Sequence, residues 1–111
     1  MSWAKRQRNK GYHDFVMIPR KILQDEDWRR FTSSAKLLYI YLKGRYNGRN
    51  NGQIRLCYSQ LKTVKGLSSP GTVSHAFHEL EKAGWVSPTK HGGLFRHFNE
   101  YKLTGKIDDY L

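Results

Sequence analysis

The segment from Ser69 to Gly84 constrains the fold more than any other part of this 111-residue chain. Ser69 is a favourable N-cap residue, Pro70 suits the first position of a helix, and Gly84 suits the residue that ends one. Apolar residues between them recur at helical spacing and predict a single buried face: Val73, Ala76, Phe77 and Leu80. We therefore expect a helix from about Ser69 to Ala83, packed on a core by this face.

Two earlier patterns predict the helices that accompany it. Thr32 or Ser33 can cap the first of these helices. The apolar residues of that helix share one face: Ala35, Leu38, Tyr39, Leu42 and Tyr46. Tyr58, Leu61 and Val64 predict a second, short helix, and Gly66 is placed to end it in a left-handed conformation. This short helix and the helix that starts at Ser69 are joined by a tight turn at Gly66, and such a pair makes a helix-turn-helix.

Short strands are predicted on either side of this pair of helices. Gln53–Leu56 alternates polar and apolar residues, as a strand with one buried face does. Trp85–Ser87 and Phe98–Leu103 are also strand-like, and the turn-forming run Lys90–Gly93 lies between them. The sequence therefore predicts an α+β fold that ends in an antiparallel hairpin.

The rest of the chain completes one domain, because 111 residues suffice for a single core. Residues 1–14 are predicted to form a flexible basic arm, residues 15–104 the folded domain, and residues 105–111 a loose acidic tail. Within the domain, Phe15–Pro19 is expected to be extended and Arg20–Asp27 to form one or two helical turns. Aromatic residues on or beside the apolar stripes are expected in the core: Trp28, Phe31, Tyr39, Tyr41 and Trp85.

Composition excludes several classes of protein. The chain is 38% apolar and 14% aromatic, which argues against wholesale disorder. Its apolar runs fall well short of the roughly 20 residues that cross a bilayer, and its N-terminus lacks the apolar stretch of a secretory signal. We therefore expect a cytoplasmic protein with no membrane partner. The single cysteine, Cys57, cannot form an internal disulfide.

The balance of charge indicates a polyanionic partner. Lys and Arg number 20 against nine Asp and Glu, for a formal net charge of +11. Residues 28–78 contain nine basic residues and no acidic one, so this stretch cannot neutralise itself by internal ion pairs. Phosphates are the expected counter-charge, because each Lys or Arg placed on a phosphate releases counterions. An anionic membrane is less favoured, since no segment pairs a basic face with a bulky apolar face free of core duties.

The outer face of the helix at residues 69–83 holds the main candidate contacts to nucleic acid, opposite the apolar face. These residues are small, hydroxyl-bearing or basic: Ser69, Gly71, Thr72, Ser74, His75, His78 and Lys82. Further candidates lie in the hairpin and in the N-terminal arm, where basic side chains suit the sugar-phosphate backbone or a minor groove: Lys90, His91, Arg96, Lys5, Arg6 and Arg8. The helix face carries no Arg or Asn for bidentate base contacts, which predicts modest sequence specificity.

Other interpretations of the same residues remain open. The polar helix face also suits a domain that packs on another protein, and the hairpin also suits an ordinary exposed turn. His75 and His78 are spaced to share a metal ion, but no carboxylate or cysteine is placed to complete the coordination shell, so no metal is expected. We find no enzyme signature, and we expect no catalytic residue and no cofactor.

Several short motifs occur in a characteristic order. They are Phe15–Pro19 before a short helix, Ala35–Tyr39 in the next helix, Asn51–Gly52 before the strand, Thr72–Val73, and Glu79–Glu81 followed by Gly84. Together they resemble the winged-helix domain of plasmid replication initiators and of small, uncharacterised phage-associated helix-turn-helix proteins. The resemblance extends from Phe15 to Leu103, and the run Leu80–Trp85 also looks like many winged-helix regulators.

The resemblance implies an α+β winged helix-turn-helix fold, with a three-helix core, a short strand before the second helix and a C-terminal hairpin as the wing. It implies non-catalytic binding of double-stranded DNA through the third helix and the wing. A transcriptional regulator would dimerise on a palindrome, whereas a replication-initiation protein of a mobile element would prefer directly repeated sites and recruit replication proteins. An RNA-binding or protein-interaction winged-helix module is the alternative.

Overall fold

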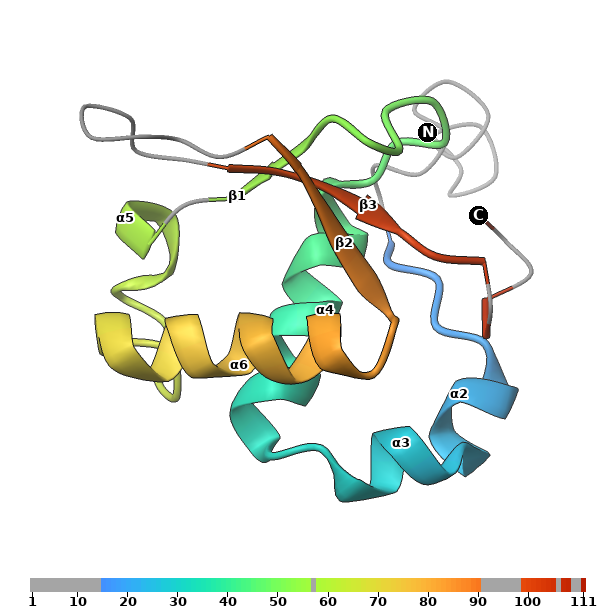
Figure 1. Cartoon of the computed structure of the whole chain (residues 1–111), viewed down its shortest axis with the longest axis horizontal. Helices are drawn as coiled ribbons and strands as arrows, with labels where there is room; N and C mark the ends of the chain where they lie inside the picture. The colour runs from blue at the N-terminus through green and yellow to red at the C-terminus, as the bar shows by residue number, and fades with distance from the viewer. Residues whose placement is uncertain (1–14, 57, 91–98, 106, 109–110) are drawn as a thin grey trace, which may run out of the picture.

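The computed structural model describes residues 15–56, 58–90, 99–105, 107–108 and 111. Within them the chain forms helices and an antiparallel sheet, an α+β arrangement (Figure 1). The elements follow one another as α2 (Arg20–Gln24), α3 (Glu26–Arg30), α4 (Ser33–Arg45), β1 (Ile54–Leu56), α5 (Tyr58–Leu61), α6 (Pro70–Lys82), β2 (Val86–Lys90) and β3 (Asn99–Leu103).

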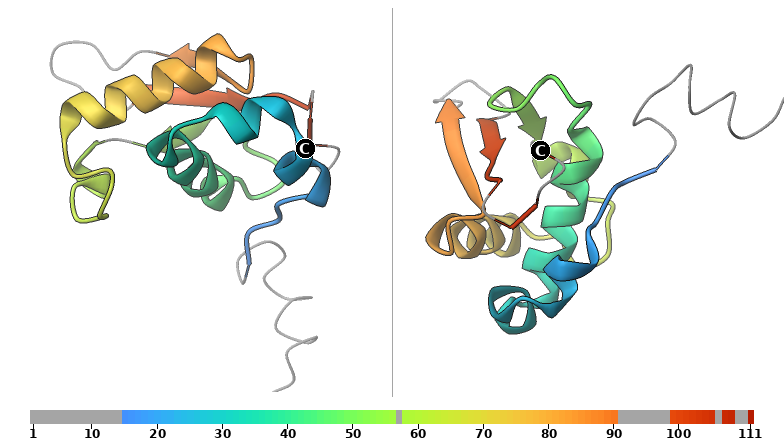
Figure 2. Two further views of the ribbon diagram at one scale, coloured as in Figure 1. Left: turned by 90° about the horizontal axis from the view of Figure 1, so that it is seen from below. Right: turned by 90° about the vertical axis from the view of Figure 1, so that its right-hand side faces the viewer.

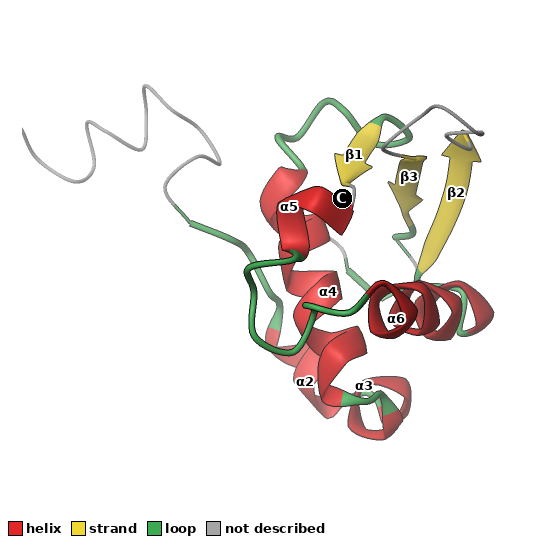
Figure 3. Cartoon of the chain, turned by 90° about the vertical axis from the view of Figure 1, so that its left-hand side faces the viewer, coloured by secondary structure: helices red, strands yellow, loops and turns green. Residues whose placement is uncertain are grey.

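The strands form one antiparallel sheet in the order β1-β3-β2. Tyr101 of the central strand pairs with Ile54 on one side and with Pro88 on the other. Proline is tolerated at Pro88 because β2 is an edge strand, where a missing N–H removes no ladder bond. The sheet packs against α4 through β1 and against α6 through β2, so that α4 and α6 share one core with it (Figures 1 and 3).

Helix α4 is the central element of this core. Its N-cap is Thr32, whose hydroxyl accepts a hydrogen bond from the Ala35 N–H at 3.2 Å. The predicted inner face is confirmed, with all of its members buried: Ala35, Leu38, Tyr39, Leu42 and Tyr46. The expectation that Tyr41 is a core residue is wrong. It is 38% exposed, because helical spacing places it on the outer side of α4.

The other predicted core aromatics surround Trp85, the residue between α6 and β2. Its ring centroid lies 5.1 Å from that of Phe31, 5.3 Å from that of Tyr39 and 6.0 Å from that of Trp28. The Trp85 indole Nε1 donates a hydrogen bond to the Asp27 carboxylate at 3.0 Å, so the buried ring also has its polar atom satisfied. This aromatic cluster joins α3, α4 and the start of β2.

Two predicted helical segments differ in length from the expectation. Residues 20–27 do not form one segment, because Asp25 is extended and ends α2. Its carboxylate then caps α3 by accepting a hydrogen bond from the Asp27 N–H at 2.8 Å. Helix α5 ends at Leu61, earlier than the predicted Val64. The chain then turns to Gly66, whose φ of 99° is the left-handed conformation expected there.

The prediction of a loose C-terminal tail is wrong at Asp108, which is buried and forms an ion pair with the buried Lys43 of α4. Ile107 and Leu111 pack against the same core. Burial raises the pKa of the Tyr39 phenol well above its usual range, and the charge of Asp108 adds to the effect. A free tail was expected because acidic residues near a chain end are usually solvated. Here Asp108 instead neutralises the buried Lys43.

This ion pair makes a prediction about stability. Asp108→Ala leaves the Lys43 ammonium buried without its carboxylate, so we expect a loss of about 3–5 kcal/mol in the free energy of unfolding, measured by urea titration. Glu26→Ala, which breaks the exposed Glu26–Arg30 pair, should cost less than about 0.5 kcal/mol. Equal losses in the free energy of unfolding for the two substitutions would contradict burial of the Lys43–Asp108 pair.

Candidate nucleic-acid interface

The beginning of α6 is built as the sequence predicts. Ser69 is extended at the N-cap, with φ −108° and ψ 133°, and Pro70 occupies the first helical position. The Ser69 carbonyl accepts the Val73 N–H at 3.1 Å, while its hydroxyl caps none of the N–H groups described in α6. The first turn of α6 therefore presents amide donors toward solvent, and these carry the positive end of the helix dipole.

The end of α6 fixes the direction in which the hairpin leaves it. Gly84 has a φ of 81°, its N–H bonds to the Glu81 carbonyl at 3.0 Å, and the Trp85 N–H bonds to the Leu80 carbonyl at 3.0 Å. This pair of bonds is a Schellman motif, which requires a left-handed residue at the glycine. Trp85 then enters the aromatic cluster, so the orientation of α6 and the start of β2 are set together.

The two faces of α6 are separated as the sequence predicts. Val73, Ala76 and Leu80 are buried, and Phe77 stacks on Tyr101 with ring centroids 4.5 Å apart. The predicted contact residues lie on the other side, where all are exposed except the half-buried Thr72: Ser69, Gly71, Thr72, Ser74, His75, His78 and Lys82. The structure thus gathers these seven residues on one solvent-facing surface, which we call the α6 outer face.

One acidic side chain of α6 is bonded to the start of α4. The Glu79 carboxylate accepts hydrogen bonds from the Thr32 N–H at 2.7 Å and from the Thr32 hydroxyl at 2.8 Å. Because Thr32 caps α4, the negative charge of Glu79 lies at the positive end of that helix. The two bonds tie α6 to the start of α4.

Gly71 leaves room in front of the first turn of α6. A Cβ built at this position would meet only the Ser69 hydroxyl, at the ordinary contact distance of 3.7 Å. Neither the packing around it nor its backbone conformation requires glycine, since its φ is not positive. The missing side chain is therefore free to serve close approach of a ligand to the helix backbone.

Two exposed lysines that were not among the predicted contacts lie just before the helix. Lys62 and Lys65 belong to the connection between α5 and α6. Their place in this turn is the signal that could have identified them. The Tyr58 hydroxyl donates to the Ser68 carbonyl, which holds the end of this connection in place.

The predicted hairpin is present as the antiparallel pair β2–β3, with Val86 opposite Leu103. Lys90 is the last residue of β2. The remaining predicted contacts of the hairpin and the arm lie outside the described residues: His91, Arg96, Lys5, Arg6 and Arg8.

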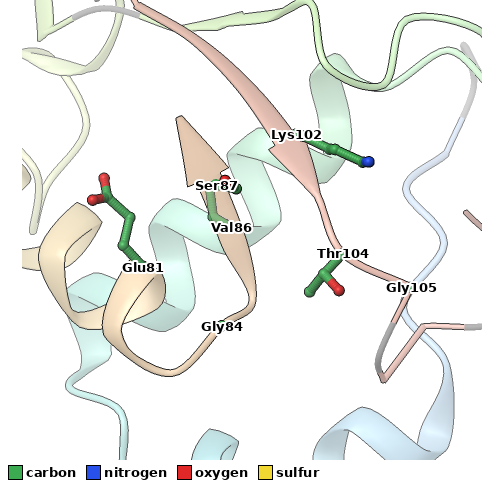
Figure 4. A pocket seen from close by; sticks show the side chains of 7 residues that line it. All are labelled: Glu81, Gly84, Val86, Ser87, Lys102, Thr104 and Gly105. Carbon is green, nitrogen blue, oxygen red and sulfur yellow. The ribbon is translucent and has the colours of Figure 1, made fainter. Parts of the chain in front are cut away.

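An open depression lies beside Gly84, between the end of α6 and the hairpin (Figure 4). It is lined by one acidic and one basic side chain and by small or apolar residues: Glu81, Lys102, Gly84, Val86, Ser87, Thr104 and Gly105. None of the predicted contacts belongs to this lining, so the depression is separate from the α6 outer face.

Among the described residues, no three His, Cys, Asp or Glu side chains gather as metal ligands would. The helices there are all too short or too polar to traverse a bilayer.

Comparisons of the chain with protein-family models, with curated proteins and with solved structures found no match. Function is therefore inferred from the geometry and charge of the site itself.

Proposed function

We propose that this chain is a winged helix-turn-helix domain that binds double-stranded DNA without catalysing a reaction. In this assignment α4, α5 and α6 are the three core helices, and β1 is the short strand before the second of them. Helix α6 is the recognition helix, and the β2–β3 hairpin is the wing. The order of the elements and the left-handed Gly66 between α5 and α6 support the assignment.

The observation that carries the proposal is the exposed α6 outer face. Recognition helices insert the first half of their length into the major groove, so small and hydrogen-bonding residues are needed there. Gly71, Thr72, Ser74 and His75 meet this need. Glu79, the first acidic residue along the helix, is bonded to Thr32.

The charge around this face supports a phosphate-rich partner. Lys62 and Lys65 precede the helix, and Lys82 lies near its end. The solvent-facing amides at the start of α6 add donors suited to a phosphate oxygen. With a formal charge of +11, the chain would derive most of its affinity from phosphates.

The same face suggests how selective the binding would be. Serine, threonine and histidine donate single hydrogen bonds to bases or phosphates, whereas arginine and asparagine make the strong bidentate contacts. We therefore propose that α6 positions the protein in the groove with modest preference among sequences. Regulation of transcription and initiation of replication on a mobile element are the roles that fit such a domain.

The first experiment measures binding to random duplex DNA as a function of salt. If roughly five to eight phosphates are neutralised, the logarithm of the association constant should fall with log[salt] with a slope of about −4 to −7. Matched double-stranded RNA serves as the competitor. Absence of DNA binding at low salt, or stronger binding to the RNA duplex, would reject the proposal.

A second experiment separates base contacts from phosphate contacts. Thr72→Ala with His75→Ala should reduce the preference for a selected site by about tenfold and change the affinity for random DNA much less. Lys90→Ala with Arg96→Ala should instead weaken binding to all sequences similarly. If the Lys90/Arg96 variant instead lost sequence preference and the Thr72/His75 variant lost general affinity, the hairpin would contact the bases and the helix the phosphates.

A further inference from the structure

The side of α4 that faces away from α6 carries exposed apolar side chains. Ile40 and Tyr41 are each 38% exposed, and Val16 is 41% exposed. Val16 lies over Gly44, since a Cβ built on that glycine would be 3.6 Å from a Val16 methyl group. Gly44 follows Ile40 and Tyr41 by four and three residues, so the three apolar side chains are neighbours. We call them, with Gly44, the α4 apolar stripe.

The two charged residues that flank the stripe along α4 are both basic. Lys36 lies one turn before Ile40 and Arg45 one turn after Tyr41, so a cation stands at each end. Helix α4 contains no acidic residue. In Figure 2, residues 15–19 run along this side of α4, and α6 and β2 lie on its other side. The stripe is therefore a surface distinct from the α6 outer face.

The size and charge of the stripe decide among possible occupants. Its three side chains expose on the order of 200 Å² together, far below the roughly 800 Å² per partner of a stable dimer. A second copy would also bring Lys36 and Arg45 against like charges. Insertion into a lipid surface needs an apolar face that can be buried to a depth of about 5–10 Å, whereas each of these side chains is already more than half covered by the protein.

We propose that the α4 apolar stripe binds a short, acidic, amphipathic segment of a protein partner. Apolar residues of the segment would cover Ile40, Tyr41 and Val16, and its carboxylates would pair with Lys36 and Arg45. If the segment is helical, its apolar side chains would recur about one turn apart and lie against the apolar stripe of α4. The proposal stands whether or not α6 binds DNA.

The test uses synthetic helical peptides of roughly 18 residues, studied by calorimetry with the full chain. The acidic probe carries Leu at helical spacing on one face and Glu elsewhere. The first control probe replaces every Glu with Lys, and the second replaces every Leu with Gln. We expect the acidic probe to bind with a dissociation constant on the order of 10 µM and both control probes to bind at least about tenfold more weakly.

Variants of the chain locate the binding on the stripe. Ile40→Gln with Tyr41→Gln should weaken the acidic probe at least about tenfold, and Lys36→Glu with Arg45→Glu should do the same. The matched controls lie on the α6 outer face: His75→Gln with His78→Gln, and Lys82→Glu. They should change the affinity by less than about twofold. Urea midpoints equal to that of the unmodified chain verify that each variant is folded.

Several results would overturn the proposal. One is a Lys probe that binds as tightly as the acidic probe. Another is an Ile40/Tyr41 variant that keeps its full affinity for the acidic probe. A third is a loss of that affinity in the α6 controls equal to the loss in the stripe variants. A concentration-dependent dimer that the Ile40/Tyr41 variant abolishes would assign the stripe to a second copy instead. Binding to vesicles rich in anionic lipid, lost in that variant while the acidic probe fails to bind, would assign it to a membrane surface.

Discussion

The packing of Trp85 is the interaction on which the rest of this structure depends. The ring lies against Trp28, Phe31 and Tyr39, and its indole N–H is bonded to Asp27, so one side chain unites α3, α4 and the start of β2. Trp85 also closes the Schellman motif of α6 through its backbone N–H. The direction of α6 and the departure of the hairpin are therefore determined by the same residue.

This arrangement leaves two helices with outer faces of different chemistry. Helix α6 presents small, hydroxyl and imidazole groups, and its Glu79 is bonded to the start of α4. Helix α4 presents apolar side chains between Lys36 and Arg45. Within the described residues, the buried Lys43 of α4 is paired with Asp108, and Arg55 of β1 is paired with Glu100. Two surfaces of different chemistry are thus held on one core.

Local signals in the sequence predicted the elements of this fold well, because caps, glycine turns and helical spacing act within a few residues. Ser69, Pro70 and Gly84 located α6, and its two faces followed from spacing alone. The contacts that orient the elements were not predicted. Thr32–Glu79, Asp27–Trp85 and Lys43–Asp108 join residues 47, 58 and 65 positions apart, and nothing local in the chain specifies such pairs. The same limit explains why the C-terminal tail was expected in solvent, whereas the error at Tyr41 was avoidable, because helical spacing alone puts that residue on the outer side of α4.

We propose that α6 and the β2–β3 hairpin together form the surface that contacts DNA. Amide chemical-shift changes measured by NMR during titration with a short duplex test this claim most directly, because they report each backbone position separately. We expect the largest changes on residues 69–78 and on β2 and β3, with little change at Ile40, Tyr41 and α2. Changes concentrated on the outer side of α4, with α6 unaffected, would contradict it.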